Sequence, residues 1–382
     1  MSQTEAPYIA IACGGTGGHL FPGMAVAEKL LEKGCDVLLL VSEKEIDQIT
    51  SRSAAGMEVM RLPAVPLLKG NLPSFLKAFW KSFWIMRAHF KKRPPTAVLA
   101  MGGFTSAAPI LAGKFAGART ALHEANSYAG RANRLLSGWV NHVFIGFSSA
   151  ANQLRNRSVQ FTGTPVRSQF QPSDPAAARM ALGLEPESPV VLVMGGSQGA
   201  SAINKAILEA VPLLLEKEPA LQFLHLTGAA TFESISKAYK ELTGRAKVLP
   251  FLTEMELALA AASVTVSRAG ASSLAELAAM ELPAILIPYP NAADDHQYHN
   301  ARALAQPGAA RMVIQSQLKA EPLAAAILEL ITNEPLRDQL KGELRKWHYP
   351  NAADEIIETL LPPLAFSEQE ATHKTLLKAH AG

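Results

Sequence analysis

The 382-residue sequence predicts an α/β protein whose two domains face each other across a cleft. Its length exceeds what one ordinary core accommodates. Short apolar runs alternate with helical patterns, which is typical of parallel sheets with crossover helices. A short apolar run followed by a glycine-rich loop also occurs twice, since Tyr8–Cys13 precedes Gly14–Gly18 and Val190–Met194 precedes Gly195–Gly199. The two halves therefore look like diverged copies of one architecture.

The first half contains five apolar runs that are expected to form strands. They are Tyr8–Cys13, Asp36–Val41, Ala97–Met101, Thr120–Leu122 and His142–Ile145. A helix is expected from about Met24 to Lys33, because Gly34 is a common residue at a helix C-terminus. Turn-forming residues in Thr162–Arg167 and Gln171–Pro175 indicate the linker to the second half.

The second half repeats the pattern and ends in helices. Its expected strands are Val190–Met194, Gln222–Leu226, Lys247–Leu249, Val264–Ser267 and Ala284–Pro288. Helices are expected near Pro322–Thr332, Glu334–Trp347 and Ala353–Leu361, and the last twenty or so residues are polar.

Composition limits the class of the protein and its partners. Hydrophobic residues make up 48% of the chain and charged residues 18%, as in globular proteins, and the net charge of only +3 predicts no nucleic-acid partner. Cys13 and Cys35 fall on expected strands, so we interpret them as small buried hydrophobic residues. No signal peptide opens the chain and no apolar run reaches ~18–20 residues, so a soluble or peripheral protein is expected.

Both glycine loops are suited to binding anions. Glycines let backbone N–H groups approach a ligand closely, and a helix N-terminus favours negative charge, so two phosphate-bearing ligands are expected. Tight turns without a ligand are the alternative. Leu20 stands where a dinucleotide fingerprint needs its third glycine, and neither loop has the lysine of a P-loop. Hydride transfer and ATP hydrolysis are therefore disfavoured, and neither a metal nor another cofactor is expected.

Three polar side chains are candidates for chemistry or binding. His19 follows the first glycine loop and is either a general base or a helix-start residue bonded to its own loop. Glu276 suits the two hydroxyls of a ribose, although a capping box, with Ser272 or Ser273 as the cap, would explain it as well. Gln297 offers a donor and an acceptor to sugar hydroxyls.

His296 and His299 are spaced for a shared metal ion. The sequence offers no third ligand near them, so no metal site is expected there.

The segment 69–93 combines an aromatic face with many cations and no acidic residue. A helix with tryptophan and phenylalanine on one face and lysine and arginine on the other suits an anionic membrane surface. The alternative is a helix whose apolar face packs inside the first domain. The residues expected to meet the membrane are Leu72, Phe75, Phe79, Trp80, Phe83, Trp84, Lys77 and Lys81, of which Leu72 and Phe75 also suit a core.

An ordered set of short motifs resembles the MurG family of peripheral membrane glycosyltransferases, family 28. These enzymes add N-acetylglucosamine to lipid I to make lipid II in peptidoglycan synthesis. Each motif is weak alone, but together they span about residues 8 to 310 in the family's order. They are Gly14–His19 with Pro22-Gly23, Met101–Gly103, His123–Asn126, Gly163–Arg167, Gly195–Gly199, Arg268–Gly270 through Glu276, and Gln297-Tyr298.

The resemblance implies a GT-B fold, with two Rossmann-like domains and a C-terminal helix that crosses back to the first. The corresponding parts are an acceptor and membrane-binding domain at 1–163, a donor-binding domain at 164–348, the returning helix at 349–363 and a polar tail at 364–382. The implied partners are UDP-N-acetylglucosamine, lipid I, an anionic membrane and other cell-wall synthesis proteins. The implied location is the cytoplasmic face of the inner membrane.

The resemblance also implies roles for individual residues. His19 is the first choice for general base and Glu124 the alternative. The acceptor diphosphate would meet Gly14, Gly15, Gly102 and Gly103. The donor would meet Thr16, Gly17, Gly18, Asn126, Arg167, Ser197, Leu252, Ala271, Ser272, Ser273, Leu274, Ala275, Glu276 and Gln297.

Two positions depart from the family's pattern. Ala125 and His296 stand where the family often has glutamine, so sugar recognition is less firmly indicated than nucleotide binding.

The implied reaction is an inverting displacement at C1 of the donor sugar by the 4-hydroxyl of the muramyl sugar. A helix N-terminus, loop amides and Arg167 would stabilise the departing UDP, and Thr162–Arg167 would be the hinge for domain closure. Three alternatives stay open: a glycosyltransferase acting on diacylglycerol, a UDP-sugar epimerase, and a membrane-bound sensor of nucleotide sugars.

Overall fold

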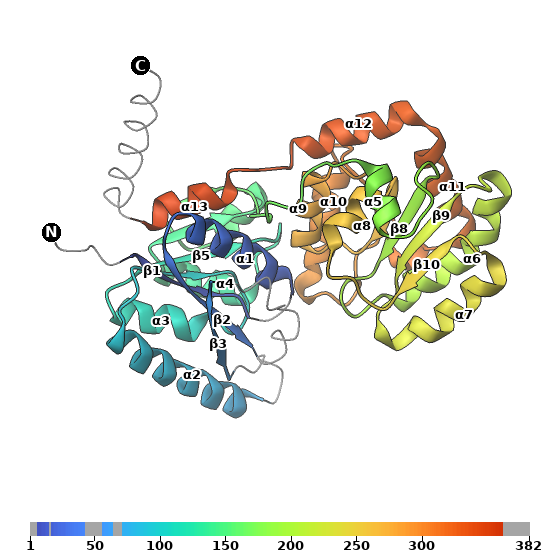
Figure 1. Cartoon of the computed structure of the whole chain (residues 1–382). Helices are drawn as coiled ribbons and strands as arrows, with labels where there is room; N and C mark the ends of the chain where they lie inside the picture. Colours follow the sequence, from blue (N-terminus) through green and yellow to red (C-terminus); the bar gives the residue numbers. More distant parts are fainter. Residues whose placement is uncertain (1–5, 15–16, 43–55, 64–70, 362–382) are drawn as a thin grey trace, which may run out of the picture.

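The computed structural model describes residues 6–14, 17–42, 56–63 and 71–361. Within these residues, two parallel β-sheets form the centres of two lobes that lie side by side (Figure 1). We call them the first lobe, built on strands β1 to β7, and the second lobe, built on β8 to β13. The predicted α/β architecture is confirmed. Gly15, Thr16 and the polar tail at 364–382 lie outside the described residues.

The first lobe has the strand order β3-β2-β1-β4-β5-β6-β7. Helices cover both faces of its sheet, so the inner strands are apolar throughout. Its elements are β1 (Tyr8–Ala12), α1 (Gly17–Glu32), β2 (Asp36–Ser42), β3 (Glu58–Leu62), α2 (Leu72–Lys92), β4 (Ala97–Ala100), α3 (Ala107–Phe115), β5 (Arg119–Glu124), α4 (Arg131–Leu136), β6 (His142–Ile145) and β7 (Val159–Phe161).

The second lobe repeats this winding with the order β10-β9-β8-β11-β12-β13. Its elements are α5 (Pro175–Ala181), β8 (Val190–Met194), α6 (Ser201–Lys217), β9 (Gln222–Leu226), α7 (Phe232–Leu242), β10 (Ala246–Leu249), α8 (Met255–Ala261), β11 (Val264–Ser267), α9 (Ala271–Ala279), β12 (Ala284–Leu286), α10 (His296–Ala305), β13 (Arg311–Met312), α11 (Ala320–Thr332) and α12 (Glu334–Arg345).

All ten expected strands are present, to within two residues at either end. The sequence analysis missed β3, β7 and β13, which are edge strands with partly exposed side chains and no continuous apolar run. The predicted start of the first helix at Met24 was wrong. Helix α1 begins at Gly17 and contains Pro22, whose presence hid the earlier turns from the pattern.

Each sheet has one point where the winding reverses, and the glycine loops lie at these two points. In the first lobe β1 lies between β2 and β4, and in the second β8 lies between β9 and β11. Open parallel sheets bind ligands at the carboxyl ends of such neighbouring strands. The topology therefore places a candidate site in each lobe.

The chain passes between the lobes twice. After α12 it returns to the first lobe as α13 (Ala352–Leu360), which lies beside α1 (Figure 1). Ile356, Ile357 and Leu360 join the same apolar cluster as Leu20 of α1. At the crossing itself, Gly163 of the outgoing chain lies directly against the ring of Tyr349 in the returning chain.

Helix α2 has two apolar faces rather than one. Phe83 is 5% exposed and packs toward the sheet, so its predicted membrane contact was wrong. Phe75 and Phe79 are half-buried, whereas Lys77 and Lys81 are exposed. The outward stripe, one residue per turn, consists of Leu72, Leu76, Trp80 and Trp84, which are 44–63% exposed.

Phe115, at the end of neighbouring α3, adds a 63% exposed ring beside this stripe. We call these five residues the aromatic stripe. No helix in the described ranges combines the length and apolarity needed to cross a bilayer.

A buried polar network supports the second glycine loop. The Asn204 amide donates to the Thr227 carbonyl at 3.0 Å and to Thr231 Oγ1 at 2.9 Å, so its oxygen faces His225 Nε2, 3.0 Å away. His225 Nε2 must therefore carry the proton, and Tyr239 donates to Nδ1 at 3.1 Å. Burial lowers the pKa of His225 to about 3, which keeps the ring neutral.

Candidate active site

In the first lobe, the loops after β1 and β4 touch each other through backbone atoms. A β-carbon at Gly103, whose φ is +82°, would overlap the carbonyl oxygen of Gly14. The imidazole of His19 lies against Gly102 on the other side of this contact. The structure thus brings together Gly14, Gly102, Gly103 and the first turn of α1, where Gly17 and Gly18 lie.

His19 is kept neutral by its surroundings. Burial, followed by repulsion from His296 and His123, lowers the pKa of His19 to about 4. At neutral pH the imidazole therefore has a lone pair that can accept a proton. His296 belongs to the second lobe, so the electrostatics of this residue depend on both lobes.

Glu124 is almost wholly buried, and both of its carboxylate oxygens accept hydrogen bonds from its own loop and from helix α4. Its Oε1 accepts hydrogen bonds from the N–H of Asn126 at 2.8 Å and from the amide of Asn126 at 3.0 Å. Its Oε2 accepts from the N–H of Gly130 and the amide of Asn133, both at 2.8 Å. Four donors favour a carboxylate that shapes the loop, so this geometry favours His19 over Glu124 as the base.

The second lobe presents two loops that lead into helix N-termini. Ser197 is exposed at the tip of the loop between β8 and α6. A β-carbon at Gly199 would overlap the carbonyl oxygen of Thr227, so this loop also depends on backbone contact. Leu252 is half-buried against the core of the lobe.

The second of these helices, α9, starts at Ala271 after Gly270, and no side chain caps it. The predicted cap by Ser272 or Ser273 was therefore wrong, and the first turn of the helix runs through Leu274. A capping box needs its glutamate at the third residue of the helix, which here is Ser273. Glu276, which follows Ala275, is the sixth residue and therefore lies too far along the helix.

Arg167 and Glu276 face the same narrow gap between the lobes. This gap is lined by Phe21, Pro22, Pro165, Val166, Arg167, Ser272 and Glu276. Arg167 is 9% exposed, stacks 5.0 Å from the Phe21 ring and makes no ion pair with any described residue, and its Nε lacks a partner among them. Burial raises the pKa of Glu276 to about 7, with Glu256 adding to the shift and Arg167 opposing it. A buried cation that forms no direct ion pair is suited to an anionic ligand.

Helix α10 carries the residues that join the lobes. Gln297 Oε1 accepts hydrogen bonds from the N–H groups of Ala269 at 3.2 Å and Tyr289 at 3.0 Å. Asn300, fully buried, donates to Asn126 Oδ1 at 3.0 Å and to the carbonyl of Ala269 at 3.2 Å. Sequence reasoning missed Asn300, although it lies one turn after Gln297 on the same helix face.

The two histidines of this helix have other surroundings. His299 stacks on Tyr128 of the first lobe at 5.2 Å, and His296 Nδ1 lies 2.8 Å from the carbonyl oxygen of Ala293. Over the described ranges, no group of three or more metal-ligating side chains is present.

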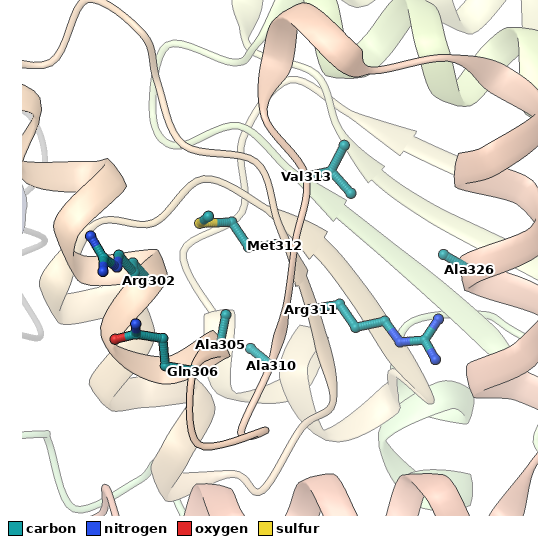
Figure 2. A pocket seen from close by; sticks show the side chains of 8 residues that line it. All are labelled: Arg302, Ala305, Gln306, Ala310, Arg311, Met312, Val313 and Ala326. Atoms are coloured by element: carbon teal, nitrogen blue, oxygen red, sulfur yellow. The ribbon is translucent and has the colours of Figure 1, made fainter.

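The gap between the lobes is small in this arrangement. Beside Phe21, Arg167 and Glu276 it holds no volume that a water molecule can enter, whereas typical ligand sites hold ~300–1,000 Å³. A second hollow, of about 560 Å³, lies elsewhere, around the edge strand β13 between α10 and α11 (Figure 2). None of the predicted site residues lines that hollow. The part of the gap beside Arg167 and Glu276 is therefore closed to a ligand in the present arrangement of the lobes.

The sequence matches two domain families in the order of the two lobes. Residues 9–145 match the glycosyltransferase family 28 N-terminal domain, and residues 190–355 match the glycosyltransferase family 28 C-terminal domain.

Relatives match nearly the whole chain. The UDP-N-acetylglucosamine--N-acetylmuramyl-(pentapeptide) pyrophosphoryl-undecaprenol N-acetylglucosamine transferase of Syntrophotalea carbinolica is 36% identical over 367 residues, which cover 91% of this chain and 97% of the relative. The protein of the same name from Halothermothrix orenii is 34% identical and covers 91% and 96%.

Solved structures show the same fold. MurG of Acinetobacter baumannii has a TM-score of 0.70 at 26% identity and covers 93% of this chain and 99% of that one. The calicheamicin glycosyltransferase CalG4 has a TM-score of 0.65 at 14% identity and covers 94% and 100%. The fold is therefore GT-B, as the sequence predicts. With both of its domains matched and relatives more than 30% identical along nine-tenths of its length, the chain belongs to glycosyltransferase family 28.

Proposed function

We propose that the protein transfers N-acetylglucosamine from UDP-N-acetylglucosamine to the 4-hydroxyl of the muramyl sugar of lipid I, giving lipid II. The observation that carries the proposal is the pair of glycine loops at the two switch points, one in each lobe, because this reaction needs two diphosphate sites that face each other. The names of the relatives and of the A. baumannii structure support the choice of substrates.

In this proposal the donor occupies the second lobe. The diphosphate meets the loop at Ser197 and the uncapped N-terminus of α9, Arg167 adds positive charge, and Glu276 accepts the ribose hydroxyls. Leu252 offers backbone hydrogen bonds to the uracil base of UDP. Gln297 holds the sugar through its amide nitrogen, because its oxygen already accepts two backbone hydrogen bonds.

The first lobe then holds the acceptor and the base. Gly14, Gly102 and Gly103 face the acceptor diphosphate, together with Gly15, and Thr16, Gly17 and Gly18 contact donor or acceptor diphosphate. His19 takes the proton of the 4-hydroxyl as its oxygen bonds to C1 of the donor sugar. The bond from C1 to the phosphate oxygen breaks, and UDP leaves with the electron pair. Helix N-termini and Arg167 stabilise its charge.

We further propose that the first lobe, 1–163, meets the membrane, that 164–348 binds the donor, and that the helix at 349–363 ties the two together. The aromatic stripe supports this division, because it is an exposed apolar surface beside lysines on the lobe that holds the acceptor site. The anionic surface would be the cytoplasmic face of the inner membrane, where other cell-wall synthesis proteins would be partners.

A release assay separates this function from its alternatives. UDP should appear when the protein receives UDP-N-acetylglucosamine and lipid I, and not when it receives the donor with diacylglycerol or the donor alone. Consumption of the donor without any acceptor would indicate an epimerase, and release with diacylglycerol a different acceptor. Binding of the donor without release under any condition would indicate a sensor.

His19→Ala should lower kcat by roughly 10²- to 10⁴-fold while changing the Kd for UDP less than threefold, because a general base acts only in the transition state. Since the pKa of His19 is about 4, kcat of the wild type at saturating donor should stay level as the pH falls from 7 to 5 and drop only as it approaches 4. Steady-state rates and calorimetry measure both. Glu124→Gln is the matched comparison, and a normal rate for His19→Ala would remove His19 from this role.

Glu276→Gln should weaken UDP binding by roughly tenfold or more, because a carboxylate accepts both ribose hydroxyls more strongly than an amide does. The pKa of Glu276 is raised to about 7, so its acceptor strength grows as the pH rises from 6 to 8. Calorimetry should therefore show that the ratio of the UDP affinity of the wild type to that of Glu276→Gln increases as the pH rises from 6 to 8. Glu256→Gln removes a charge that raises this pKa and should shift this increase to lower pH. Identical pH profiles for wild type and Glu276→Gln would contradict the ribose role.

Replacing Trp80 and Trp84 with serine should reduce binding to anionic vesicles by roughly tenfold or more without unfolding the protein, because both rings are exposed. Cosedimentation with vesicles and circular dichroism measure the two effects. Met180→Ser is a matched control, since Met180 is 60% exposed on the second lobe. Phe83→Ser should instead lower the melting temperature. Full vesicle binding by a folded double variant would contradict the membrane role of the stripe.

A further inference from the structure

We propose that Asn300 is a positioning residue that couples closure of the lobes to the placement of the turn before α9. The proposal rests on the proposed function, because that turn would hold the donor. It assigns to Asn300 the alignment of the two half-sites, and no direct contact with substrate.

The three hydrogen bonds of the Asn300 amide reach two segments, one in each lobe. Its Oδ1 accepts from the N–H of Ser127 at 2.8 Å, and its Nδ2 donates to Asn126 Oδ1 and to the carbonyl of Ala269. Asn126 and Ser127 belong to the loop that Glu124 organises in the first lobe. Ala269 belongs to the turn that starts α9 in the second. One fully buried amide therefore joins both lobes.

The turn at Ala269 is held at both ends of its peptide by the same helix. Gln297 accepts from the N–H of Ala269, and Asn300 donates to its carbonyl. Gln297 can hold the turn in an open molecule, because Gln297 and Ala269 both lie in the second lobe. The contacts of Asn300 with Asn126 and Ser127 exist only when the lobes are closed. Through Asn300, the position of the first lobe therefore affects the position of the turn at Ala269.

A second set of contacts surrounds this amide at the surface. Asp294 pairs with Arg131 at 2.6 Å and with Arg134 at 3.2 Å, and Tyr128 stacks on His299. Asp294 has a φ of +51°, an uncommon conformation for a residue other than glycine. Arg131 is largely exposed, so solvent screens this pair, whereas Asn300 is shielded from water. The buried amide is thus the specific contact of the closed state.

The gap between the lobes requires this contact to break and form again in each cycle. The gap beside Arg167 and Glu276 has no room for a water molecule in this arrangement, so we expect the lobes to open when the donor binds there. An amide that finds all its partners only on closure gives the closed state a defined geometry.

A double-mutant cycle tests the coupling on the full-length protein, with lipid I and UDP-N-acetylglucosamine as substrates. Asn300→Ala should lower kcat by roughly 10- to 100-fold, because misplacement of reacting groups by about 1 Å has effects of this size. The Kd for UDP should change less than threefold, because Gln297 still holds the turn. Asn126→Ala combined with Asn300→Ala should be no slower than Asn300→Ala alone, because Asn300→Ala already removes the hydrogen bond through which Asn126 acts on the turn.

The matched control is Asn204→Ala, which removes a buried asparagine whose partners all lie within the second lobe. In the double variant Asn126→Ala/Asn204→Ala, the fold-decrease in kcat should equal the product of the fold-decreases of the two single variants. Multiplying effects for Asn126→Ala and Asn300→Ala would overturn the coupling, as would an Asn300→Ala variant with normal kcat. Failure of the proposed function would look different, because the wild type itself would then release no UDP with lipid I.

Discussion

The candidate site depends on close contact between backbone segments at the carboxyl ends of the central strands. In the first lobe Gly103 touches the carbonyl of Gly14, and in the second Gly199 touches that of Thr227. A side chain at Gly103 would push the loop after β4 away from the loop that leads into α1. A side chain at Gly199 would push the loop that leads into α6 away from the loop after β9. Helices α1 and α9 border the gap between the lobes, and a helix N-terminus carries partial positive charge that favours phosphates.

Around this frame, a few buried or partly buried groups are held in states that they would not adopt in water. His19 is neutral well below neutrality, and Glu276 holds its proton up to about pH 7. Arg167 is buried and makes no direct ion pair with a described residue. Such groups raise the free energy of the unliganded protein. Ligand binding can recover this energy, so the same features that weaken the fold favour the complex.

The inner part of each sheet was predictable, because strands such as Tyr8–Ala12 and Val190–Met194 are apolar on both faces. The edge strands and the first turns of α1 were not, because Glu58–Leu62 is half-exposed and Pro22 interrupts a helical pattern. The glycine loops were found from local spacing alone. Asn300 was not, because its partners lie more than thirty or a hundred and seventy positions away. A residue that acts through distant contacts carries no local signal.

The crossing of the chain at Gly163 and Tyr349 has a mechanical consequence. Both covalent connections between the lobes pass through this one place, with the glycine backbone seated on the aromatic ring. We therefore expect the lobes to swing about this place as a single pivot, which would leave both connecting segments unstretched. The energy needed to open the lobes would then come from the reversible side-chain contacts on the side away from the pivot. Substitutions at those contacts would change how often the lobes open without changing the direction of the motion.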